Sequence, residues 1–409
     1  MAGKWFLANG FWVGKIGGKV TIMKKHLKPL LKLAVIYVLR FVMRVLSIFP
    51  IRKNRIVFNS YRGEQYSCNP KYISQGLQKL YPEKYEIIWA FKNPRKFYDL
   101  KKSGIKLVSF ASIKRFYYEA TAKISINNIG SYSWMPVRKG QEHINTWHGA
   151  VDYKKVALSE INNDAIMKKT LLMSARETTL YLSANKFFSE YCIPTEFGYR
   201  GEILEYGLPR NDELYFRNTQ KARDIIVRKY NIDPNNIIVL YAPTWRYDPN
   251  QKIILLDFSM VKNSTEKRFG KECTVIFRAH HITGYVGTGN DRVVDVTDYP
   301  DSQEIMASSD LMITDYSSMI WDFSLTGRPC FLYAPDIDTY VTERGFNIPV
   351  DKWGFAICTT SQELGRAIEG YNAENYQKIV QEHHNTLGSC ETGHATEKVC
   401  QWIDGRCHA

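Results

Sequence analysis

The chain has 409 residues, of which 44% are hydrophobic and 23% are charged, and its formal net charge is +14. This length predicts two domains of ordinary size plus an extension. The composition excludes a disordered protein and a small disulfide scaffold. Eight cysteines occur without a Cys-x-x-Cys pair, which predicts reduced thiols and no structural zinc site.

The positive charge is concentrated at the N-terminus. Residues 1–56 contain twelve Lys or Arg, and the first acidic residue is Glu64. Removing those twelve charges leaves +2 for the rest of the chain, which is therefore nearly neutral. A basic segment on a near-neutral body predicts that one end of the molecule meets an anionic surface. The aromatic and aliphatic residues of the segment favour a membrane over a nucleic acid, so we expect no nucleic-acid partner.

Residues 24–50 predict an amphipathic helix that lies in the plane of a membrane. Charges inside its apolar stretch make a membrane-spanning helix too costly. A basic side is expected from Lys28, Lys32, Arg40 and Arg44. An apolar side is expected from Leu31, Val35, Val38, Val42 and Leu46. A core helix packed on the rest of the molecule is the alternative with the same periodicity. We expect residues 1–50 to form a membrane-associating segment.

After Pro50, β-rich runs alternate with segments of helical period. The first half predicts strands at 55–60, 85–91, 106–110, 123–128 and 143–147. The second half predicts strands at 237–245, 273–280, 292–297, 311–316 and 329–335. Such alternation predicts parallel sheets with helices on both faces. The expected α/β fold is of the GT-B type, with two Rossmann-like domains, residues 51–212 and 213–409, facing a cleft.

Two predicted strands end in histidine motifs at this cleft. Trp147, His148 and Gly149 close the strand at 143–147, and a histidine there is suited to take a proton from an attacking hydroxyl. Arg278 and His280 close the strand at 273–280, where they could clamp a phosphate. Each histidine alone is also compatible with a purely structural role.

A third motif lies between the strand at 311–316 and the helix that follows it. Asp315, Ser317 and Ser318 occupy this turn. The unpaired N–H groups and positive dipole of a helix start, together with serine hydroxyls, predict an anion site. An ordinary helix cap explains the same residue types.

Six blocks in a constant order make residues 55–400 similar to a known family: TWHG, GLPRNDEL, YAPTWR, RAH, TDYSSMIWDFSLTGRPCFLYAPD and ERGFNI. They resemble the CDP-glycerol glycerophosphotransferase family, which includes teichoic acid primases and polymerases and related capsule enzymes. The resemblance implies that His148 activates the acceptor hydroxyl and that His280, with Arg278, contacts the donor pyrophosphate. It implies further substrate contacts at Gly149, Arg210, Arg246, Asp315, Ser317, Ser318, Asp322 and Arg344.

The resemblance implies transfer of glycerol phosphate from CDP-glycerol to an undecaprenyl-diphosphate-linked acceptor, with release of CMP, at the cytoplasmic face of the cell membrane. It implies no metal site and no cofactor. CDP-ribitol or another CDP-polyol stays open as the donor. A hexosyltransferase and a non-catalytic membrane-bound module that binds anionic polymer stay open as alternative functions.

Two departures from the family pattern concern the substrate. The family's WHGTPLK is here WHGAVDYKK, in which Lys154 and Lys155 supply positive charge, and the residues after RGF are NIPVDKWGF.

Overall fold

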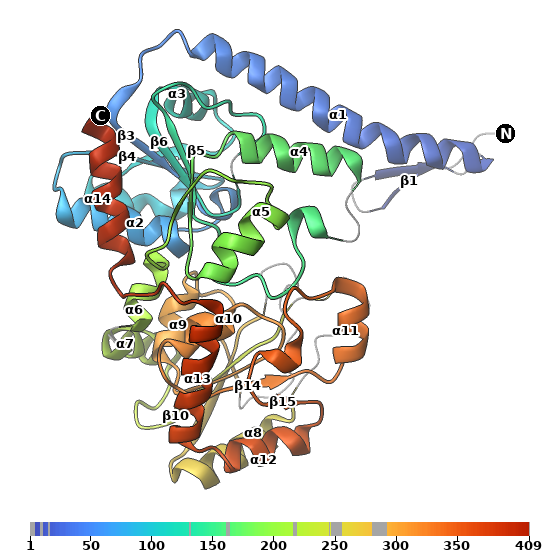
Figure 1. Cartoon of the computed structure of the whole chain (residues 1–409), viewed down its shortest axis with the longest axis vertical. Helices are drawn as coiled ribbons and strands as arrows, with labels where there is room; N and C mark the ends of the chain where they lie inside the picture. The colour runs from blue at the N-terminus through green and yellow to red at the C-terminus, as the bar shows by residue number, and fades with distance from the viewer. Residues whose placement is uncertain are drawn as a thin grey trace.

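The computed structural model describes residues 5–8, 11–14, 17–130, 132–160, 164–215, 219–244, 246, 256–279 and 293–408, with side chains from Leu30 onward. Within these residues two parallel sheets form the centres of two α/β domains (Figure 1). A small antiparallel pair, β1 (Trp5–Ala8) and β2 (Phe11–Gly14), precedes them and is not predicted by the sequence.

The first sheet has the strand order β5-β4-β3-β6-β7-β8-β9. Its strands are β3 (Arg52–Phe58), β4 (Glu86–Phe91), β5 (Lys106–Ser109), β6 (Ala122–Asn127), β7 (Glu142–Asn145), β8 (Leu180–Leu182) and β9 (Glu202–Leu204). Its helices include α2 (Cys68–Leu80), α3 (Ile113–Thr121), α4 (Ala165–Arg176) and α5 (Ile193–Glu196). All five strands predicted for this half are confirmed. Residues 94–103 form a 3₁₀ helix.

The second sheet has the order β12-β11-β10-β13-β14-β15. Its strands are β10 (Ile237–Ala242), β11 (Cys273–Phe277), β12 (Val293–Asp295), β13 (Leu311–Thr314), β14 (Cys330–Tyr333) and β15 (Ile357–Cys358). The α-helices around it are α6 (Asp212–Tyr215), α7 (Thr219–Tyr230), α8 (Phe258–Phe269), α9 (Ser302–Ser308), α10 (Met319–Ser324), α11 (Ile337–Arg344), α12 (Ser361–Glu369) and α13 (Ala373–Leu387). The five strands predicted for this half are also confirmed. Two Rossmann-like domains with parallel sheets are therefore present.

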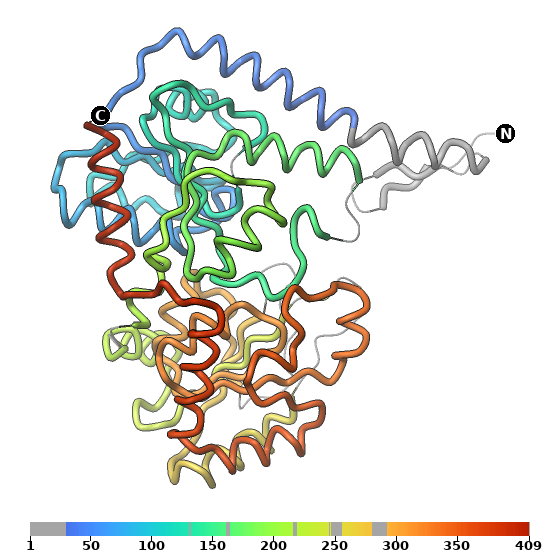
Figure 2. Tube along the Cα trace, in the orientation of Figure 1, coloured from blue at the N-terminus to red at the C-terminus, as the bar shows by residue number. Residues whose placement is uncertain are grey.

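The last helix, α14 (Ala395–His408), follows the strands of the second sheet in the chain. It packs on α2 and β3 of the first domain. Figure 2 follows the red end of the chain from the second domain back to the first. The contact is close, because a Cβ on Gly76 of α2 would lie 2.9 Å from the Cys400 sulfur. The Lys84 ammonium pairs with Asp404 at the end of the same interface.

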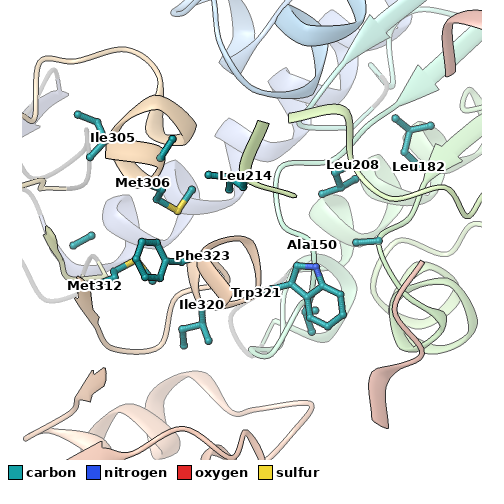
Figure 3. Close-up of a cluster of buried hydrophobic side chains, with 14 of the residues drawn as sticks. Ala150, Leu182, Leu208, Leu214, Ile305, Met306, Met312, Ile320, Trp321 and Phe323 are labelled. Carbon is teal, nitrogen blue, oxygen red and sulfur yellow. The ribbon is translucent and has the colours of Figure 1, made fainter. Parts of the chain in front are cut away.

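One apolar core continues from the first domain into the second. Figure 3 shows part of this buried cluster, with Leu182 and Leu208 from the first domain and Met312 and Phe323 from the second. These side chains are at most 9% exposed within the cluster, so the two domains share a dry contact rather than a hydrated gap.

The N-terminal helix α1 (Gly17–Leu46) lies across α3 and α4 (Figure 1). Ile36 and Met43 are buried against the body of the molecule. Arg40, expected on the outer basic side, instead faces the body and pairs with Glu177 at 2.6 Å. The expectation for Arg40 is wrong because Ile36 and Met43, one turn before it and one turn after it, are buried, and Arg40 lies on the same side of the helix. In the part of the chain that the structure describes, no helix is long and apolar enough to cross a membrane.

Candidate active site

His148 lies on a tight turn just after β7. The turn is held by Asn145, whose side-chain oxygen accepts a hydrogen bond from the Trp147 N–H at 3.0 Å, while Trp147 adopts a left-handed φ of 48°. His148 Nδ1 lies 2.8 Å from the backbone oxygen of Asn128. A carbonyl oxygen only accepts, so Nδ1 carries the proton. In the neutral ring Nε2 is therefore the basic nitrogen, which is the state that a general base requires.

A buried amide that the sequence analysis missed supports this turn. Asn69 at the start of α2 donates to the backbone oxygens of Thr146 and Trp147, at 3.1 and 3.2 Å. Its own side-chain oxygen accepts from the Arg210 N–H at 3.1 Å. Asn69 thus ties two separate motif blocks together. Single amides in helices carry no sequence pattern, so only the structure identifies it.

Arg210 is engaged by protein groups on both sides. Its Nη1 donates to the backbone oxygen of His148, and its Nη2 donates to Asp322 of α10 at 2.7 Å. Both side chains of the ion pair are nearly inaccessible, at 5% and 3% exposure. Asn211 donates to the other oxygen of Asp322 at 3.0 Å. The structure therefore brings the predicted residues Arg210 and Asp322 together, as a buried brace between the domains that positions the His148 turn.

Gly149 and Ser318 bring the two domains into close approach beside His148. A Cβ added to Gly149 would lie 3.5 Å from the Ser318 hydroxyl oxygen and 3.3 Å from Asp152 Oδ1. An added Cβ would therefore be tight against Asp152 and in van der Waals contact with Ser318. The predicted turn before α10 and the predicted histidine turn are therefore neighbours in space.

The two predicted serines differ in their surroundings. The Ser317 hydroxyl accepts a hydrogen bond from the Met319 N–H at 3.2 Å, which is the capping role foreseen as the alternative. Ser318 is the N-cap by position but makes no side-chain capping bond. Helix α10 has six residues, so its dipole is small, and the Ser318 hydroxyl is the better-placed polar group of the two.

Asp315 and Arg246 form a second buried network at the ends of β13 and β10. Asp315 accepts from the Thr244 N–H at 2.8 Å and from Arg246 Nη1 at 2.9 Å. Arg246 also donates to both oxygens of Asp336, at 2.7 and 3.0 Å. Burial and these carboxylates act in opposite directions on the pKa of Arg246, with a net rise above its ordinary value. Arg246 therefore stays charged and is bonded on both edges of its guanidinium.

Arg278 follows β11 and donates to the backbone oxygens of Val296 and Tyr299, at 3.2 and 2.6 Å. Burial lowers its pKa, although Asp301 opposes that effect. His280, predicted beside it, lies outside the described residues. Arg344, at the end of α11, pairs with Glu160 at 3.0 Å, and burial lowers its pKa as well.

The chain segments after His148 and after Arg344 pair directly. Lys154 and Phe346 form an antiparallel bridge, and the Asn347 N–H donates to the Tyr153 oxygen at 2.7 Å. Asp152, at the start of this segment, accepts from the Trp147 indole N–H at 3.1 Å. Its other oxygen is buried without a described partner, and burial raises its pKa to about 7. Both family departures noted in the sequence therefore meet at this bridge.

A family model described as CDP-Glycerol:Poly(glycerophosphate) glycerophosphotransferase matches residues 41–405. The chain belongs to this family. The teichoic acid poly(glycerol phosphate) polymerase of Bacillus subtilis (strain 168) is 28% identical over 372 residues, covering 87% of this chain and 49% of that protein. The teichoic acid glycerol-phosphate transferase of Staphylococcus aureus (strain NCTC 8325 / PS 47) is 27% identical over 388 residues, covering 88% of this chain and 95% of that protein. This chain thus spans about half the length of the Bacillus relative.

The solved structure of the wall teichoic acid polymerase TagF is 26% identical to this glycerophosphotransferase-family chain. The two superpose with a TM-score of 0.78, over 96% of this chain and 99% of that chain. The similarity therefore covers both Rossmann-like domains and the junction that carries His148.

The arrangement can support phosphoryl transfer by position and charge. In this member of the glycerophosphotransferase family, a histidine with a defined basic nitrogen belongs to a turn whose next residue, Gly149, approaches a serine of the opposite domain. Fixed positive side chains surround the junction. Phosphoryl transfer is catalysed mainly by such positioning and electrostatic stabilisation.

Proposed function

We propose that this chain transfers glycerol phosphate from CDP-glycerol to a hydroxyl of an undecaprenyl-diphosphate-linked acceptor and releases CMP. The acceptor oxygen attacks the β-phosphorus, the bond from that phosphorus to the bridging oxygen breaks, and the acceptor proton passes to His148 Nε2. The observation that carries the proposal is the Nδ1 contact with the Asn128 carbonyl, which leaves Nε2 as the basic nitrogen of a turn that approaches the opposite domain at Gly149 and Ser318. Membership in the glycerophosphotransferase family supports the choice of donor.

Donor contacts are proposed on the second domain. Ser318, with Ser317, would contact the donor phosphates, and Arg278 with His280 the pyrophosphate. Gly149 would let the donor approach the histidine turn. Arg344, at the end of α11, would also bind substrate. Arg210, Asp322, Arg246 and Asp315 would act on substrate through the groups they hold in place, since each is bonded to protein partners.

Membrane association at the cytoplasmic face is proposed for α1. Its surface away from the body carries exposed apolar side chains: Leu31, Val35, Val38, Phe41, Val42 and Val45. Lys32 and Arg44 are exposed on the same helix and would meet anionic headgroups. The domain boundaries at residues 50 and 212 stay predictions.

Mass analysis of products formed from CDP-glycerol and a synthetic undecaprenyl-linked disaccharide tests the proposal. The expected product is heavier than the acceptor by one or more glycerol phosphate units, with one CMP for each. CDP-ribitol belongs in the same donor panel, because a teichoic acid ribitol-phosphate primase of Bacillus spizizenii is 24% identical to this chain. Release of nucleotide from a UDP-sugar alone would support a hexosyltransferase. Absence of release from every donor would support a binding module.

A further inference from the structure

Lys154 is a partly buried lysine at the domain junction that the proposed mechanism does not use. Its backbone is fixed from both sides: residue 154 bridges to Phe346, and the Asn347 amide donates to the Lys154 oxygen at 3.3 Å. Its ammonium lies 5.8 Å from the centroid of the Tyr340 ring. The side chain thus leaves the first domain and reaches α11 of the second.

No carboxylate among the described residues lies close enough to pair with this ammonium. The charged groups that influence the pKa of Lys154 are Asp315, Arg344, Arg246 and Asp152. Asp315 is already bonded to Thr244 and Arg246, and Arg344 is bonded to Glu160. Lys154 is therefore a desolvated cation whose anionic neighbour is occupied by another cation.

The titration behaviour agrees with this geometry. Burial lowers the pKa of Lys154 to about 8, and Asp315 only partly opposes that effect. A charge removed from water without a partner is costly, and an anion that enters the site would relieve the cost. Lys155, the next residue, is exposed and its stem lies against Gly345, so the two lysines differ in environment and not in type.

We propose that Lys154 binds a phosphate group of a substrate, and that it is a contribution of the first domain to phosphate recognition. The inference rests on the proposed function, since the phosphates in question are those of CDP-glycerol and of a glycerol-phosphate acceptor. Lysine acts on phosphate as a compact point charge, and Lys154 follows the histidine turn in the chain and reaches α11 of the second domain.

The test compares the wild type with Lys154→Met and Lys155→Met by calorimetric titration of two probes, CDP-glycerol and a short glycerol phosphate oligomer. Lys154→Met should weaken binding of a phosphorylated probe by about 10- to 100-fold, and Lys155→Met should not. Weaker binding of CDP-glycerol assigns the donor phosphate, and weaker binding of the oligomer assigns the acceptor phosphate. Unchanged binding of both probes overturns the inference.

Proton uptake gives a second readout that needs no variant to be active. The phosphodiesters of both probes are already ionised at pH 8.5, whereas Lys154 is partly neutral there. Binding to the wild type should therefore take up protons, measured in buffers of different ionisation enthalpy, and the uptake should be lost in Lys154→Met. Equal uptake in both proteins contradicts the inference. A wild type that binds neither probe contradicts the proposed function itself.

Thermal denaturation separates this role from a structural one. Removing an unpaired desolvated ammonium should leave the melting temperature of Lys154→Met equal to or above that of the wild type. A large fall in melting temperature, with binding reduced only in proportion to the unfolded fraction, would make Lys154 a structural residue.

Discussion

The Asn128 carbonyl determines which nitrogen of His148 can act as a base. Replacing His148 by alanine should lower kcat by a factor of about 10²–10⁴ while the affinity for CDP stays near that of the wild type. Steady-state kinetics and calorimetric titration of CDP measure the two quantities. A variant with near-normal turnover would exclude the base assignment.

His143 on β7 offers a matched control. It is buried, its Nδ1 lies 2.8 Å from the Glu177 oxygen, and burial lowers its pKa to about 4. His143→Ala should lower the melting temperature and leave turnover per folded molecule unchanged, because its ring contacts only the scaffold. The two variants therefore separate a catalytic histidine, on the turn after β7, from a structural histidine on β7 itself.

The Arg210–Asp322 brace should behave as a buried ion pair. Arg210→Met leaves the Asp322 carboxylate without its cation and should cost about 3–5 kcal/mol of unfolding free energy. Urea denaturation measures this cost. Adding Asp322→Leu to the same protein should recover most of it, since an apolar pair replaces an ion pair with little penalty. Unchanged stability with lost CDP affinity would instead make Arg210 a direct substrate ligand.

Asp152 predicts a pH dependence of stability. Burial raises the pKa of Asp152 in the folded state to about 7, above its ordinary value of 3.8, so the folded state binds more protons between those values. The contribution of Asp152 is therefore most favourable at low pH and is lost as pH rises to about 7. Asp152→Asn should denature at a higher temperature than the wild type at pH 8, and this advantage should shrink as the pH is lowered to 5. A constant difference across this range would show that Asp152 titrates normally.

At the scale of elements, α1 has one side packed on the body and one side of exposed apolar residues. Val38 and Phe41 are 62% and 67% exposed. Replacing both by glutamate should release the protein from anionic vesicles at moderate salt, because each lost apolar side chain removes about 1.5–3 kcal/mol of burial. Vesicle sedimentation measures the bound fraction.

Val341 on α11 provides the control for that experiment. It is an exposed apolar residue of the second domain, at 44% exposure, away from α1. Val341→Glu should leave vesicle binding intact. If both substitutions, or neither, release the protein, α1 is not the specific membrane contact.

At the scale of the whole molecule, the domains are joined by a second polar contact besides the Arg210–Asp322 pair. Lys71 of α2 pairs with Asp301 and Glu304 at the start of α9, at 2.5 and 2.8 Å. Lys71→Met should lower the free energy of unfolding by about 3 kcal/mol or more, since two partly buried carboxylates lose their cation. Chemical denaturation checks the loss, and Lys84→Met, which removes a more exposed pair with Asp404, should cost far less.

The sequence predicted the sheets well because most strands are long apolar runs with clear turn signals. It missed β8, β9 and β15, which have three, three and two residues and lack a detectable period. It also put the histidine motif and the turn before α10 at the carboxyl ends of predicted strands, where ligands of such folds bind, and the structure brings these two turns together.

What the sequence could not predict depends on tertiary contacts. The pairing of Arg210 with Asp322 joins residues 112 positions apart, and Asn69 acts through backbone groups of distant loops. The direction of Arg40 depends on which stripe of α1 is buried, and the helical period alone allows several. Residue types at motif positions therefore indicated the location of the site but not which side chains are engaged by the protein itself.

The return of α14 to the first domain has a consequence for biosynthesis. On the ribosome, residues 395–408 emerge only after every strand of the second sheet, so α2 and β3 stand without their partner helix until those residues have been made. Domains otherwise tend to fold as they emerge, from the N-terminus onward. The surface around Gly76 and Ile73 is then a transient apolar face that a nascent chain must shield. A ribosome stalled shortly before residue 395 should therefore hold a chain in which the first domain is open to protease at α2, although all of its own strands have been made.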